Sequence, residues 1–265
     1  MPQLTAVGIG ISYGRSSIVD GLDLAVAPGA FTALVGPNGS GKSTILRALA
    51  GLLAPNAGTI HLDGSSIARL STREIARHIG TLTQVPTAPE GLTVLDLVRQ
   101  GRYPHRSLFG RWSAADDNAC AEALDLTGIV DLADHLLENL SGGQRQRAWI
   151  AMTLAQQTNI LLLDEPTTFL DLAHQIEVMN LIGDLVAVRG KTVVAVLHDL
   201  NQAARYADRM VMLKHGRIVA AGNPLAVMTA ELIESVFGVA ATIITDPVAG
   251  TPMCIPAAGG SRAQV

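Results

Sequence analysis

A glycine-rich loop at residues 36–44 limits this chain to a small set of folds. The loop follows an apolar run at residues 30–35, typical of a buried strand, and precedes a helical pattern at residues 43–50 that stops at Gly51. This order places backbone N–H groups around an anion at a helix N-terminus, so it predicts an α/β fold that binds a phosphate. The loop consists of Gly36, Pro37, Asn38, Gly39, Ser40, Gly41, Lys42, Ser43 and Thr44.

Two side chains of this loop carry specific chemistry. Lys42 is long enough to reach the β and γ phosphates of a nucleotide, and the Ser43 hydroxyl is a suitable ligand for Mg²⁺. The glycines let the backbone approach the phosphates closely. The alternative is a glycine-rich turn that contains a lysine by chance, but such a turn does not require a strand before it and a helix after it.

Composition supports a cytosolic α/β protein. Hydrophobic residues make up 48% of the 265 positions and aromatic residues only 3%, so the core must be aliphatic, as in a buried parallel sheet. The net charge of −4 gives no general affinity for nucleic acid or anionic lipid. Cys120 and Cys254 are expected to be free thiols. No basic residue precedes Arg15 and no apolar run reaches the about 18 residues of a membrane span, so we expect neither a signal peptide nor a transmembrane helix.

The sequence patterns indicate one domain with an insertion and an appendage. Short apolar runs between Leu4 and Val26 predict a small antiparallel sheet before the main fold. From Pro86 the β-branched runs disappear, and they return at Ile160, which predicts an inserted helical subdomain. The predicted parts of the domain at 1–256 are an α/β core at 1–85 and 159–215, a helical subdomain at 86–158 and a C-terminal appendage at 216–256, with a disordered tail at 257–265.

Local signals place several elements. Capping-box patterns at Ser71 and at Ser113 predict helices that begin at the next residue. His215 and Gly216 predict a hairpin, and residues 246–251 are expected to form a turn between two short strands.

Two acidic residues follow the apolar strand predicted at residues 160–164. Pro166 is expected to hold Glu165 in extended backbone and so to end the strand. Because ligands bind at the carboxyl edge of a parallel sheet, we expect Asp164 to hold Mg²⁺ and Glu165 to orient and deprotonate the attacking water. A solvated acidic turn is the alternative, and the phosphate-binding loop argues against it.

A second glycine-containing helix start lies at Ser141, Gly142, Gly143 and Gln144. By the same physics it is a second anion site. One nucleotide bound at the first loop does not need a second site, unless that site closes on ATP held by another subunit. The alternative is an ordinary helix start followed by a solvated basic face.

The phosphate-binding loop, LSGGQ at residues 140–144 and LLLDEPT at residues 161–167 resemble, in this order, the ATP-binding subunits of ABC transporters. The resemblance covers nearly the whole chain. It implies a P-loop NTPase core, a small N-terminal antiparallel β subdomain and an inserted helical subdomain. It also implies a Mg²⁺-dependent ATPase that binds ATP between two copies of itself at the cytoplasmic face of the membrane. A separate permease, and indirectly a substrate-binding protein, would be the partners, without nucleic acid.

The resemblance also implies roles for single residues. Tyr13 is similar to the aromatic residue that stacks on adenine, Gln84 to the glutamine that touches Mg²⁺, and His198 to the histidine that contacts the γ-phosphate. Residues 170–171 are similar to the loop that crosses the dimer interface. Glu165, His198 and Gln84 would then be catalytic, and Ser43, Gln84 and Asp164 would hold the metal. Judged without the resemblance, Tyr13 could be a half-buried strand tyrosine, Gln84 a strand-end amide and His198 a core histidine.

Three further stretches, at residues 101–112, 169–179 and 246–252, resemble the ATPase subunits of ferric-siderophore importers, with haem and cobalamin importers as near relatives. Phe169, in place of a small residue, favours the iron-importer branch. An exporter subunit, or an ABC ATPase that works on DNA or ribosomes, is a less favoured alternative. The first stretch is expected to contact the permease through four apolar side chains beside three arginines: Tyr103, Leu108, Phe109 and Trp112, with Arg102, Arg106 and Arg111. The alternative is that its rings pack inward and only stabilise the helical subdomain.

Overall fold

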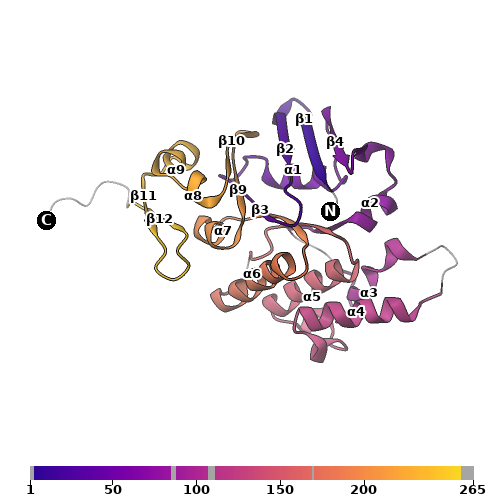
Figure 1. Cartoon of the computed structure of the whole chain (residues 1–265). Coiled ribbons are helices and arrows are strands. Elements are labelled where there is room, and N and C mark those ends of the chain that lie inside the picture. Colours follow the sequence, from indigo (N-terminus) through magenta and orange to yellow (C-terminus); the bar gives the residue numbers. More distant parts are fainter. Residues whose placement is uncertain (1–2, 85–87, 107–110, 169, 258–265) are drawn as a thin grey trace.

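Five parallel strands and one antiparallel edge strand form the central sheet (Figure 1). The computed structural model describes residues 3–84, 88–106, 111–168 and 170–257. The α/β prediction is confirmed, because the strand before the phosphate-binding loop lies in the middle of this sheet. From edge to edge the strands are β10 (Arg217–Gly222), β9 (Arg209–Lys214), β3 (Phe31–Val35), β8 (Thr192–Val196), β7 (Ile160–Asp164) and β6 (Ile79–Leu82).

Both faces of the central sheet are buried. Successive side chains of a strand point to opposite faces, so one strand supplies two hydrophobic clusters. In β3, Ala33 belongs to one cluster and Leu34 to the other, and in β8 the same holds for Ala195 and Val194. This explains why the predicted strands are continuous apolar runs rather than alternating ones.

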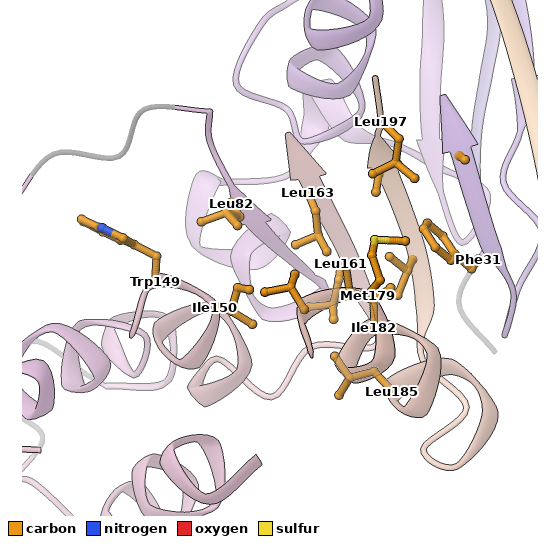
Figure 2. Packing of buried hydrophobic residues seen from close by; sticks show 14 of the residues in the cluster. Phe31, Leu82, Trp149, Ile150, Leu161, Leu163, Met179, Ile182, Leu185 and Leu197 are labelled. Atoms are coloured by element: carbon orange, nitrogen blue, oxygen red, sulfur yellow. The ribbon is translucent and has the colours of Figure 1, made fainter. Parts of the chain in front are cut away.

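Three helices cover one face of the central sheet. Figure 2 shows Met179, Ile182 and Leu185 of one helix directed toward Leu161 and Leu163 of the neighbouring strand. The apolar side chains of that helix recur every three or four residues, so they share one face and all reach the sheet. The three helices are α5 (Gly142–Ala155), α6 (Leu172–Ala187) and α7 (Leu200–Tyr206).

A helix and a second sheet cover the other face. Ile45, Leu46 and Leu49 of α1 (Lys42–Leu49) are buried in the cluster between the two sheets. The second sheet is antiparallel, as predicted from the runs between Leu4 and Val26. Its strands are β2 (Ser16–Ala25), β1 (Leu4–Tyr13), β4 (Ala57–Leu62) and β5 (Ser65–Ser66), and it leads into η1 (Ile67–Arg69) and α2 (Thr72–His78).

The predicted helical insertion contains helices that pack on one another below the central sheet in Figure 1. The capping box at Ser113 is present as predicted, and Thr93 forms one more. The division of the chain into core, insertion and appendage stays a prediction. The elements before α5 are α3 (Val94–Gln100), η2 (Tyr103–His105), α4 (Ala114–Leu126), η3 (Val130–Leu132) and η4 (Leu137–Asn139).

The expectation that Arg102 helps to form a surface contact is wrong. Only 5% of Arg102 is exposed, so it does not stand on the surface beside aromatic rings. Its Nε donates to Oδ1 of Asp116 at 2.9 Å, and its Nη1 donates to the carbonyl of Ala155 at 2.7 Å. The side chain therefore joins the ends of α3 and α5 to the start of α4, which is the physical reason for its burial.

The last part of the chain is fastened to α7. As predicted, residues 246–251 join two short strands, and Asp246 Oδ2 accepts a hydrogen bond from Arg205 Nη2 at 2.5 Å. The Asn201 amide accepts from the backbone N–H of Cys254 at 2.7 Å and donates to its carbonyl at 3.2 Å. Residues 258–265 lie outside the described residues. The elements are α8 (Pro224–Val227), α9 (Ala230–Phe237), β11 (Ala241–Thr245) and β12 (Pro252–Pro256).

Among the helices of residues 3–84, 88–106, 111–168 and 170–257, none is both long and apolar enough to cross a bilayer.

Two glycine substitutions test the helix packing. A Cβ on Gly101 would lie 2.1 Å from the carbonyl oxygen of Met152, which is backbone and cannot move aside cheaply. We expect Gly101→Ala to lower the free energy of unfolding by about 1–3 kcal/mol, as overpacked cores do. The matched control is Gly183→Ala in α6, where the nearest atom to a new Cβ is Tyr206 Cδ1 at 4.0 Å. That variant should be more stable by about 0.5–1 kcal/mol, because alanine restricts the unfolded chain. Urea unfolding measures both, and a Gly101→Ala protein as stable as wild type contradicts the packing.

Candidate functional site

Parallel strand order brings the predicted site residues to one edge of the sheet. Strands β3, β8, β7 and β6 are neighbours, so the loops that follow them leave the sheet side by side. Residues that follow these four strands, together with residues of β1 and β2, line one open cavity of about 530 Å³. Its lining residues are Tyr13, Ile18, Asn38, Gly39, Gly41, Lys42, Ser43, Thr44, Gln84, Glu165 and His198.

The phosphate-binding loop holds a buried ammonium group. Lys42 Nζ donates to the carbonyl of Gly36 at 2.8 Å and to that of Pro37 at 3.0 Å. Burial lowers the pKa of Lys42, while the negative charges of Glu165 and Asp164 act in the opposite direction. The lysine is thus held in place by neutral carbonyls, which leaves its charge available for an anion in the cavity.

Two glycines of the loop serve different purposes. Gly39 has a φ of +77° and open space where a Cβ would be, so the backbone faces the cavity without obstruction. A Cβ on Gly36 would lie 2.2 Å from the carbonyl oxygen of Leu213 in β9. Gly36 is therefore required for packing of the loop against the sheet, a reason that the sequence does not reveal.

Ser43 and Asp164 form a pair of oxygen donors suited to Mg²⁺. Ser43 Oγ donates to Asp164 Oδ1 at 2.8 Å. Burial raises the pKa of Asp164, and the hydrogen bond from Ser43 offsets part of this rise. In the described part of the chain, no three His, Cys, Asp or Glu side chains lie close enough to hold a metal by themselves. The pair fits Mg²⁺, which commonly takes only one or two protein ligands beside phosphate oxygens and water.

Glu165 has a backbone conformation that the sequence analysis did not predict. Its φ is +54°, so the expectation that Pro166 holds it extended is wrong. Proline excludes mainly the right-handed helical region for the preceding residue, and here a tight turn follows, closed by the N–H of Thr168 on the carbonyl of Glu165 at 3.2 Å. Such backbone strain persists only where surrounding contacts determine it.

Three side chains supply those contacts to the Glu165 carboxylate. Gln84 Nε2 donates to Oε2 at 2.8 Å, Thr168 Oγ1 donates to Oε2 at 3.0 Å, and His198 Nε2 lies 2.6 Å from Oε1. Burial alone would raise the pKa of Glu165, but these hydrogen bonds and the His198 charge lower it. Thr168 is not among the site residues predicted from the sequence, although a hydroxyl three residues after a carboxylate is a recognisable local signal.

Tyr13 and His198, which the sequence alone allows to be either structural or functional, both line the cavity. The side chain of His198 is 45% exposed and contacts Glu165, so it is not a core histidine. Tyr13 ends β1, is 49% exposed and lines the cavity. Its ring is free to lie against a planar ligand, and its role in adenine binding stays a prediction.

The predicted second anion site, residues 141–144, does not share the cavity of the phosphate-binding loop in the same chain. Ser141 caps α5 by accepting the N–H of Gln144 at 3.2 Å, and its own N–H donates to Gln144 Oε1 at 3.0 Å. Gln146 Nε2 donates to the carbonyl of Pro166 at 2.9 Å, which ties this helix to the loop of Glu165. Residues 141–144 do not line the cavity at the phosphate-binding loop.

The stretch expected to contact a permease is partly described. Tyr103 is 62% exposed, whereas the Trp112 ring packs beneath the guanidinium groups of Arg99 and Arg106 at 5.4 and 5.6 Å. Leu108, Phe109 and, in another stretch, Phe169 lie outside the described residues.

Known proteins resemble this chain along its length. The family model described as ABC transporter matches residues 19–168. The ferric enterobactin transport ATP-binding protein of Escherichia coli (strain K12) is 51% identical, over 93% of this chain and 91% of that protein. The petrobactin import ATP-binding protein FpuD of Bacillus anthracis is 50% identical, over 96% of this chain and 93% of that protein.

Solved structures share the fold. A chain from the inward-facing conformation of a metal-chelate type ABC transporter aligns with a TM-score of 0.84 and 29% identity, covering 98% of this chain and 99% of the other. The dimeric structure of a bacterial ABC transporter cassette aligns with a TM-score of 0.75 and 30% identity, covering 83% and 98%.

The pKa shifts at two aspartates predict opposite pH dependences of stability. The raised pKa of Asp164 means that its ionisation costs stability above that pKa, and the cost vanishes as the pH falls below it. We expect Asp164→Asn to raise the Tm of the nucleotide-free protein by a few degrees at pH 8, with the gain shrinking toward pH 4.

Asp246→Asn is the control for Asp164→Asn. Hydrogen bonding from Arg205 lowers the pKa of Asp246 to about 2, so its contribution is present at neutral pH and is lost as the pH falls toward that value. This variant should melt below wild type at pH 8. Thermal melts at several pH values measure both, and an Asp164→Asn protein that is less stable at pH 8 contradicts the cost of burial.

Proposed function

Because this chain belongs to the ABC transporter family, we propose that it is the ATP-hydrolysing subunit of an importer for ferric siderophores. The observation that carries the ATPase part is the Glu165 carboxylate, held at the same sheet edge as Lys42 and the Ser43–Asp164 pair. The relatives named for ferric enterobactin and petrobactin support the cargo. Haem or cobalamin is the alternative cargo.

The cavity at the phosphate-binding loop is the proposed ATP site. Backbone N–H groups of residues 36–44 and the Lys42 ammonium would bind the phosphates, and Tyr13 would stack on the adenine. Ser43, Asp164 and Gln84 would hold Mg²⁺. When bound, the ion neutralises the phosphate oxygens and polarises the γ-phosphate.

Glu165 is the proposed general base, and its neighbours would regulate its basicity. Without nucleotide, Gln84, Thr168 and His198 all favour its ionised form and lower its pKa. Gln84 and His198 both line the cavity, so they can also turn toward a nucleotide. In that arrangement Glu165 would keep only Thr168, and its pKa would rise, which makes it a stronger base for water. Gln84 and His198 would thus act on the γ-phosphate and on the base together.

Two copies of the chain would complete each site. Ser141, Gly142, Gly143 and Gln144 do not reach the cavity of their own chain, so we propose that they close on ATP held by a second copy. The dimeric cassette with the same fold supports this arrangement.

A membrane permease is the proposed partner at the cytoplasmic face, with a substrate-binding protein acting indirectly. Tyr103, Arg106, Arg111 and Trp112 are the described residues of the proposed contact, and buried Arg102 is excluded from it. The net charge of −4 gives no support to a role on nucleic acid, and an exporter subunit stays the less favoured alternative.

Mixing two inactive variants tests the shared site. Lys42→Ala removes the first anion site and Ser141→Arg blocks the second, so each alone should lose ATPase activity by about 10²–10³-fold. A mixed dimer holds one site with both defects and one site with neither, so titrating one variant into the other should restore part of the activity. A mixture that stays inactive contradicts the shared site.

Uptake in cells tests the cargo and the base together. Glu165→Gln keeps the size of the side chain and one acceptor oxygen but removes the base. We expect it to bind ATP and to lose turnover by about 10²–10⁴-fold. In a strain that lacks the chain, wild type should restore ferric-siderophore uptake and Glu165→Gln should not. The matched control is Glu234→Gln on the exposed face of α9, which should restore uptake fully. Restored uptake of haem or cobalamin alone would contradict the cargo, and normal turnover of Glu165→Gln would contradict the base.

A further inference from the structure

His174 lies in the first turn of α6, outside the proposed ATP site. Its Nδ1 lies 2.7 Å from Asp171 Oδ1, and its backbone N–H donates to the same oxygen at 3.0 Å. Its side chain is 30% exposed. Because Asp171 is also the N-cap of α6, the carboxylate fixes both the helix start and the orientation of the imidazole.

The other side of the imidazole faces Gly143 of the second anion site. A Cβ on Gly143 would lie 2.6 Å from His174 Cδ2 and 2.7 Å from Cγ. Gly143 has no positive φ, so backbone conformation does not require glycine there. The imidazole occupies the space that a side chain at position 143 would need, and Gly143 is buried beneath it.

The residue after His174 holds the same segment from another side. Gln175 Nε2 donates to the carbonyl of Leu170 at 3.1 Å. Leu170 and Asp171 are thus both hydrogen-bonded by the first turn of α6, and the His174 imidazole also lies against Gly143 of α5. A displacement of residues 170–171 would be carried through the imidazole to the start of α5.

We propose that His174 is a positioning residue that sets the N-terminus of α5, and with it Ser141, against residues 170–171 of the same chain. The inference rests on the proposed shared site, in which Ser141 binds ATP held by the other copy. His174 would therefore act on hydrolysis at the partner's phosphate-binding loop and not at its own.

The mixture of Lys42→Ala and Ser141→Arg chains tests this directionality, because only its mixed dimers hold an intact site. In that site the second anion site comes from the Lys42→Ala chain. Adding His174→Ala to the Lys42→Ala chain should lower the restored kcat by about tenfold, the scale expected for a small misplacement of a binding group. Adding His174→Ala to the Ser141→Arg chain should leave the restored activity unchanged, because that second anion site is already blocked.

Three variants control for loss of fold. His174→Asn keeps an N–H donor in the place of Nδ1 and should recover most of the activity, and its melting temperature is compared with that of His174→Ala. If His174→Ala does not fold, His174→Leu replaces it, since leucine fills the space beside Gly143 but cannot bond to Asp171. His135→Ala, at an exposed histidine whose hydrogen bonds in the structure are those of its backbone, should have no effect on either chain.

Each other outcome overturns the proposal. Equal losses in both arrangements indicate general destabilisation, a loss only on the Ser141→Arg chain places the effect at the wrong site, and no loss in either shows that the contact is not used. The parent mixture is measured first. If it recovers no activity, the shared site itself is wrong, which separates that failure from failure of the role of His174.

Discussion

The parallel pairing of β6, β7, β8 and β3 is the constraint on which the whole site depends. Leu163 pairs with Leu82 on one side and Ala195 on the other, and Leu34 pairs with Val196. A slip of one residue would exchange side chains of different size, such as Ala33 and Leu34, between the two buried clusters, so close packing favours one register. The register in turn fixes where each strand ends. Side chains distant in sequence are therefore brought to hydrogen-bonding distance at one edge of the sheet.

The charged side chains at this edge of the sheet are all hydrogen-bonded to other groups of the protein. The buried Lys42 ammonium has two carbonyls, Asp164 has the Ser43 hydroxyl, and Glu165 has three donors. Buried polar groups without partners are costly, so these hydrogen bonds stabilise the loops that form the site. A bound nucleotide would therefore replace some of these contacts with new ones. Lys42, which bonds to neutral carbonyls, and Gln84 and His198, which share the Glu165 carboxylate, are the residues that can make this exchange.

Local patterns predicted most of the fold and the outline of the site. Strand ends, helix caps and the glycine-rich loop are encoded within a few neighbouring residues, so they could be found in the sequence. Arg102 could not, because its partner carbonyl at Ala155 is brought near only by the packing of α3 on α5. The prediction of an extended backbone at Glu165 is wrong for a similar reason, since Gln84 and His198, which contact its side chain, follow other strands.

The contact between His174 and Gly143 has an evolutionary consequence. With the imidazole in place, a larger residue at position 143 would overlap it, so such a change costs packing energy whatever its effect on ATP. Replacement of His174 by a smaller residue would open the space first. We therefore expect the two positions to be epistatic: a side chain at position 143 should cost less stability once position 174 has become smaller.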